Sequence, residues 1–246
     1  MRECSSAIPL MMRAYKTGGG DMGGQNVVEI DRRVPLAMFA LAAGALSLLL
    51  LLSSLLMPPP ATPAALVAFA SSHRVAYGLF ASLILAWSVL SVPLIVTLGA
   101  MLESSGGTLT AIAQLLSAVG VLLLGFAVFT HTAALLSIVA AGKPAQPEDA
   151  VYQAAIWSNL GFYLTDPGLM TWGLGQFLFG WVTWRSGVLP NWLAVVGVIG
   201  GIAGLMTLAV YQTAALALVQ LLSFTIWAFA TGHSLLRSRR NALARA

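Results

Sequence analysis

The residue with the clearest chemical potential is Asp166, a carboxylate inside a long apolar stretch. The chain has 12 Lys and Arg and 8 Asp and Glu residues, and Asp166 is the only one of them that falls well inside a hydrophobic span. A charged side chain at the centre of a membrane helix costs about 2.5–3.5 kcal/mol on insertion scales. Asp166 therefore needs a hydrogen-bonding partner, a polar cavity or a function.

Other polar side chains are predicted to share a helical face with Asp166. Residues three, four and seven apart lie on one side of a helix, and that spacing places together Asn159, Tyr163, Asp166, Met170 and Gly173. The preceding apolar stretch carries His131 at a predicted depth similar to that of Asp166. If the two faces meet, His131 and Asp166 form a buried pair, and the candidate site is the polar cluster of Asp166, His131, Tyr163 and Asn159.

Three interpretations of this cluster stay open at the level of sequence. A desolvated carboxylate beside an imidazole is suited to binding a proton or a cation. The same groups are equally suited to a hydrogen-bonded lock between helices, which is a common role of polar side chains in membrane bundles. In the third interpretation, Asp166 caps a helix that restarts after a kink at Pro167.

The composition predicts a membrane protein with several spans. Hydrophobic residues make up 59% of the 246 residues and charged residues only 8%. Six apolar stretches each reach the roughly 20 residues that a helix needs to cross a bilayer, at about 34–57, 75–102, 109–141, 154–184, 189–210 and 213–236. We therefore expect an all-α polytopic bundle of six transmembrane helices at 34–236, flanked by polar tails at 1–33 and 237–246.

The distribution of basic residues predicts the orientation of these spans. Ten of the 12 Lys and Arg residues lie in the two tails or in the connection after the fourth span, whereas only Arg74 and Lys143 lie on the opposite side. Basic residues near the spans stay on the cytoplasmic side. We expect both termini to be cytoplasmic, in the inner membrane of a bacterium, and we expect the positive charge to reflect topology rather than nucleic-acid binding.

Glycines and prolines indicate how the helices pack. The fifth span has overlapping small-residue pairs at Gly197, Gly200, Gly201 and Gly204. In the fourth span, glycines are spaced seven residues apart, in one set at Gly161, Gly168 and Gly175 and in a second set at Gly173 and Gly180. Such faces allow close helix contact, within the chain or with a partner. Kinks are predicted at Pro93 and Pro167.

The sequence contains no recognisable catalytic or metal-binding pattern. Cys4 is the only cysteine, and no span contains lysine. The three histidines, His73, His131 and His233, fall at different predicted depths, which disfavours a haem with two axial ligands or a copper site. We predict no metal and no cofactor, and an enzymatic function is not favoured.

The connection between the fourth and fifth spans carries the motif that resembles a known family. Residues 186–193 read Ser-Gly-Val-Leu-Pro-Asn-Trp-Leu and follow Arg185, and a glycine-rich segment at 173–180 precedes them. This pattern resembles a bacterial domain-of-unknown-function family of six-span integral membrane proteins, with Ser-Gly-x-Leu-Pro-x-Trp-Leu at the start of the fifth span. The resemblance implies the fold and the inner-membrane location, and it implies no activity.

Two functions from different classes follow from these observations. The first is a non-catalytic integral membrane protein that serves as a structural or accessory subunit, in contact with the lipid bilayer and with other membrane proteins or further copies of itself through glycine-rich helix faces. The alternative is a small proton-coupled or ion-conducting carrier organised around Asp166 and His131. A haem-binding or metal-binding membrane protein ranks third.

Overall fold

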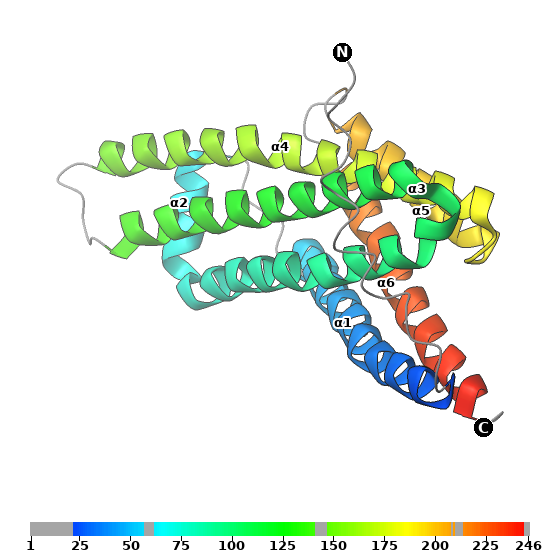
Figure 1. The fold of residues 1–246 in the computed structure, drawn as a ribbon. Helices are drawn as coiled ribbons and strands as arrows, with labels where there is room; N and C mark the ends of the chain where they lie inside the picture. Colours follow the sequence, from blue (N-terminus) through cyan, green and yellow to red (C-terminus); the bar gives the residue numbers. More distant parts are fainter. Residues whose placement is uncertain (1–21, 57–61, 141–146, 208, 210–213, 244–246) are drawn as a thin grey trace, which may run out of the picture.

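The described part of the chain is entirely helical in its regular structure, as the composition predicts. The computed structural model describes residues 22–56, 62–140, 147–207, 209 and 214–243. Figure 1 shows the six helices, which are α1 (Met22–Leu56), α2 (Pro63–Ser72), α3 (Arg74–Ala140), α4 (Pro147–Ser186), α5 (Asn191–Met206) and α6 (Ala214–Leu243).

Helix α3 consists of two antiparallel arms, residues 74–103 and 106–140, that are joined by a tight turn. Gly107 has a φ of 47° at this turn, a left-handed conformation that glycine adopts without strain. The arms lie against each other, because a methyl group at Gly99 would clash with Gln114 and one at Gly125 would clash with Ser88. The Gln114 side chain also donates a hydrogen bond across the arms to the Val96 carbonyl, at 3.1 Å.

Four segments of the described chain are long and apolar enough to cross a membrane. They are Val34–Leu55, the two α3 arms Arg74–Glu103 and Gly106–Ala140, and Ala215–Arg237. They correspond to the first, second, third and sixth of the predicted spans. Helix α5 has only 16 residues, and α4, although it has 40 residues, is too polar to meet the same criterion.

Helix α4 lies between α3 and α5, and glycines bring it close to both. On one side, methyl groups at Gly161 and Gly168 would lie 3.1 Å from the nearest atoms of α3. On the other side, methyl groups at Gly173 and Gly180 would lie 2.9 and 2.8 Å from the α5 backbone. Because each residue advances about 100° around a helix, these two glycine stripes lie roughly 100–140° apart around α4, on different faces.

An aromatic cluster at the centre of the molecule joins three helices. The rings of Trp87 in α3, Trp172 in α4 and Phe224 in α6 meet edge to face, with centroid distances of 5.3, 5.4 and 5.7 Å. Trp87 and Trp172 are almost fully buried. The indole nitrogen of Trp87 donates a hydrogen bond to the Ser47 hydroxyl, which connects α1 to the same core.

The helix ends are arranged in two groups. The α3 turn lies beside the end of α4, since Gly106 lies against Val182. Helix α6 runs toward that same end, because Gln220 contacts Leu169 in the middle of α4 and Trp227, two turns later, contacts Leu193 at the start of α5. Helix α1 packs antiparallel to α6. Figure 1 shows the start of α1 beside the end of α6, whereas α2 crosses the far end of the α3 and α4 helices.

Replacement of Gly201 by alanine should destabilise the α4–α5 contact. The new methyl group would lie 2.5–2.6 Å from atoms of Phe177, including its backbone nitrogen and Cα, so the two helices would have to separate. We expect a loss of about 1–3 kcal/mol in the free energy of unfolding. Gly78→Ala is the matched control, because its methyl group meets only the Leu136 side chain, at 3.5 Å. Thermal unfolding in detergent measures both, and equal melting temperatures would contradict the prediction.

Candidate functional site

Asp166 lies level with the middle of the α3 arms. Gly168, two residues further along α4, packs against Leu124, which is near the centre of the arm Gly106–Ala140. The Asp166 side chain is half-buried, and within the described part of the chain it forms neither a hydrogen bond nor an ion pair. The structure therefore places this carboxyl group at the centre of an apolar region without a partner from the described residues.

The polar face around Asp166 points away from the helix bundle. Asn159 is exposed and Tyr163 is 77% exposed, and neither side chain has a hydrogen-bonding partner among the described residues. By contrast, the outward faces of α3 and α5 carry apolar side chains such as Leu115, Val119 and Ile199. Asn159, Tyr163 and Asp166 thus form a polar strip on a helix that also exposes Ile156, Trp157 and Leu160.

His131 forms a different contact from the predicted one. Its Nδ1 lies 3.1 Å from the Trp157 carbonyl oxygen of α4, and its Nε2 lies 3.4 Å from the Tyr77 hydroxyl of the first α3 arm. A carbonyl only accepts hydrogen bonds, so Nδ1–H is the donor and Nε2 accepts from the Tyr77 hydroxyl. Both ring nitrogens are therefore engaged, and His131 links the two α3 arms to α4.

His131 and Asp166 are at different depths in the bundle. His131 lies about two and a half turns before the end of α3, whereas Asp166 lies about five turns after the start of α4. The residue of α4 opposite His131 is Gly161, and Asp166 is about 7.5 Å further along the helix. The pairing of His131 with Asp166 that the sequence suggests is not formed.

Helix α4 is continuous through Pro167, which bears on the capping interpretation. Its helical conformation extends from Pro147 to Ser186 and includes the proline. No helix begins after Asp166, so this side chain does not act as a cap. Pro93 likewise lies inside α3, in the first arm.

A buried polar network joins α4, α5 and α6, and the sequence pattern did not single it out. Gln176 Nε2 donates to the Ser223 hydroxyl at 2.8 Å, and this hydroxyl donates to the Val196 carbonyl at 2.6 Å. Gln220 Nε2 donates to the Leu169 carbonyl at 3.1 Å. The two glutamines are 5% and 0% exposed, and their amide oxygens lack a hydrogen-bond partner among the described residues.

The glycines of α5 make room for this network. The Gln176 and Ser223 side chains lie against Gly200, and the Gln220 amide lies against Gly204. Gly197 contacts the Trp227 ring, whose nitrogen donates to the Leu193 carbonyl at 2.8 Å. The glycine face of α5 therefore accommodates long side chains of α6 as well as the backbone of α4.

The remaining histidines are far from this network. His73 follows α2, where its ring stacks on Phe69 at 4.7 Å, and His233 is exposed near the end of α6. Within the described ranges, no three His, Cys, Asp or Glu side chains are close enough together to hold a metal ion. The arrangement is suited to hydrogen bonding between helices, and the absence of a cofactor stays a prediction.

Replacement of His131 by alanine should lower the stability of the bundle. The variant removes both hydrogen bonds that link α3 to α4 and the first arm, and interhelical hydrogen bonds in membranes contribute about 0.6 kcal/mol each on average. Thr130→Ala is the matched control, because its hydroxyl bonds only to carbonyls of its own helix. Thermal unfolding should show a lower melting temperature for His131→Ala than for Thr130→Ala, and the reverse order would disprove the link.

Comparison with known proteins identifies the family. No curated protein and no solved structure matches the chain. The family described as "Domain of unknown function (DUF4386)" matches residues 36–236, a region that includes nearly all of the apolar segments, the motif at 186–193 and the polar face of α4. This match confirms the resemblance to a domain-of-unknown-function family. The chain belongs to the DUF4386 family.

Proposed function

We propose that the chain is an inner-membrane protein of a bacterium that crosses the bilayer six times. Four segments are long and apolar enough to cross a membrane, and α4 and α5 pack against them, which supports α4 and α5 as the remaining two spans. Helix α5 is about 24 Å long, somewhat less than the roughly 30 Å of a hydrocarbon core. Local thinning of the bilayer would make up the difference.

The charges near the helix ends support cytoplasmic termini. Arg185 lies in the last turn of α4, at the same end of the molecule as the end of α6, and its guanidinium lies 5.0 Å from the centre of the Trp181 ring. Such an aromatic and basic pair is typical of a span that ends at the cytoplasmic interface. Arg74, at the start of α3, lies at the opposite end of the bundle.

Cysteine labelling tests this orientation. In a Cys4→Ser background, Asn191→Cys places a thiol at the exposed start of α5, and Arg74→Cys places one at the start of α3. With intact bacterial cells, we expect a membrane-impermeant maleimide to label Arg74→Cys and to leave Asn191→Cys unlabelled until the cells are permeabilised. Labelling of Asn191→Cys in intact cells would overturn the proposed orientation.

Within the membrane, the function that the geometry supports best is association with another polypeptide as a non-catalytic structural or accessory subunit. The observation that carries this proposal is the half-buried Asp166 at mid-level on the outward side of α4, with no partner among the described residues. Exposed Asn159 and Tyr163 extend the polar surface along the same side. A partner helix with hydrogen-bonding groups would satisfy all three side chains.

Energetics favour such a partner over contact with lipid. A charged residue at this depth costs about 2.5–3.5 kcal/mol, and hydrocarbon supplies no hydrogen bonds to an amide or a phenol. Hydrogen bonds across helices, together with close packing, are the interactions that associate helices inside membranes. Association would therefore remove a cost that the isolated chain carries.

The carrier alternative receives less support from the arrangement of its proposed residues. Both His131 nitrogens bond to groups other than Asp166. Two hollows on the described surface are lined by residues at 148–155 and by residues around Arg74 and Ala140, and neither lining includes Asp166 or His131. Asp166 faces outward, where a carrier would need it to face an enclosed pathway.

Substitution of Asp166 tests the subunit proposal. Asp166→Ala should lose the associated polypeptide, whereas Asp166→Asn should retain it, because the amide still donates and accepts hydrogen bonds. Native mass spectrometry after mild detergent extraction measures the retained mass. Leu115→Ala, on the exposed apolar side of α3, is the control and should have no effect. An unchanged assembly in Asp166→Ala would refute the proposal, and proton transport by the purified chain that Asp166→Asn abolishes would favour the carrier.

A further inference from the structure

One face of α4 runs the length of the helix and is covered along only half of it. Residues at sevenfold spacing on this face are Tyr152, Asn159, Asp166, Gly173 and Gly180. Gly173 and Gly180 lie against the glycines of α5. Helix α5 ends at Met206, close to the level of Gly173, because Gly204 is the residue opposite Gly173.

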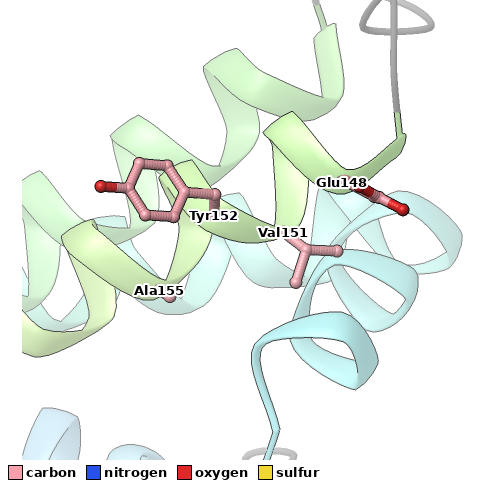
Figure 2. Close-up of a pocket in the computed structure, with 4 residues that line it drawn as sticks. All are labelled: Glu148, Val151, Tyr152 and Ala155. Carbon is pink, nitrogen blue, oxygen red and sulfur yellow. The ribbon is translucent and has the colours of Figure 1, made fainter.

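Beyond the end of α5, the same face has no covering helix among the described elements. Tyr152 is 69% exposed, Asn159 is exposed and Asp166 is half-buried. Figure 2 shows the outer end of this face, where an open hollow is lined by Glu148, Val151, Tyr152 and Ala155. The face that binds α5 at one end of α4 therefore continues, uncovered by any described helix, past Asp166, Asn159 and Tyr152 at the other end.

The side chains on this open surface can form hydrogen bonds with the same side chains of a second copy. An amide such as Asn159 both donates and accepts hydrogen bonds, and so does a phenol. Two carboxyl groups that face each other share a proton, so that one donates a hydrogen bond to the other. A helix with these groups at sevenfold spacing can pair with an identical helix in parallel, as in a coiled coil with polar residues in its seam.

The membrane makes the parallel arrangement the natural one. Copies of one chain insert with the same orientation, so a closed pair is related by a two-fold axis along the membrane normal. Around that axis each residue of α4 meets the same residue of the other copy. A partner of different sequence would instead have to supply matching groups at the same two depths.

We propose that the first half of α4, residues 147–166, binds α4 of a second copy of this chain in parallel, with Asn159 opposite Asn159 and Asp166 opposite Asp166. This inference rests on the proposed function and specifies its partner. The second copy covers the face where α5 stops, and it supplies hydrogen-bonding groups to the two polar side chains.

Disulfide formation in native membranes tests the pairing. In a Cys4→Ser background, Asn159→Cys places a thiol at the proposed axis. Leu160→Cys is the matched control, because it has nearly the same depth and a 45% exposed parent side chain but points about 100° away. A membrane-permeant oxidant should convert Asn159→Cys to a dimer on non-reducing gels and leave Leu160→Cys monomeric. Two copies with different tags show whether the cross-linked partner is this chain.

A second substitution separates pairing from chance collision. Adding Asp166→Ala to Asn159→Cys should abolish the dimer, whereas adding Asp166→Asn should preserve it. Thermal unfolding of the reduced variants establishes that each one is folded. Equal cross-linking of Asn159→Cys and Leu160→Cys would overturn the inference.

The outcomes also separate this inference from the proposed function. If Asn159→Cys forms no disulfide with a second copy but another polypeptide is retained in a manner that depends on Asp166, the pairing is wrong and the accessory-subunit proposal stands. If the chain is monomeric and retains no polypeptide, both fail.

Discussion

Helix α4 meets α3 through Gly161, Gly168 and Gly175 on one side and α5 through Gly173 and Gly180 on the other. Inside a bilayer, lipid tails are as apolar as leucine, so helices associate through close packing and hydrogen bonds rather than through the hydrophobic effect. Glycines allow backbones to approach closely enough for both. The position of α4, and with it the orientation of every polar side chain along this helix, depends on these two contacts. A methyl group at Gly173, Gly175 or Gly180 would lie less than 3.0 Å from atoms of α5 or α3, so the helix on which the candidate site is built would have to shift.

The same contacts explain why polar groups occur both inside and outside the bundle. Where α5 covers α4, the glycines leave space for Gln176 of α4 and Gln220 of α6, and their side-chain nitrogens find acceptors on Ser223 and Leu169. Where α5 has ended, Asn159 and Asp166 have no such neighbours among the described residues. The short length of α5 therefore divides one face of α4 into a half that α5 covers and a half that no described helix covers.

Much of this architecture could be predicted from sequence, because it depends on local properties. The apolar stretches become helices, Gly107 and Gly187 adopt positive φ at the two turns, and the sevenfold glycine spacing marks the faces of α4 that approach other helices. The partner of His131 could not be predicted in this way. Relative depth depends on where each helix begins, and α4 starts at Pro147, about two turns before the apolar stretch at 154. That shift carries Asp166 past His131. The bond to Tyr77, 54 residues away in sequence, has no local signal at all.

A polar face of this kind contributes more to the choice of partner than to stability. An amide or carboxyl group facing lipid destabilises the isolated chain, and a hydrogen bond gained on pairing does little more than offset that cost. A polar residue in the seam of a helix pair instead fixes the register of the helices and the number of helices that associate, because any other alignment leaves the polar group without a hydrogen bond. In the proposed pair, Asn159 and Asp166, two turns apart on α4, would apply this constraint at two depths. An apolar surface in their place would allow α4 to slide against a neighbour, whereas two polar positions seven residues apart permit only the alignment in which both are paired.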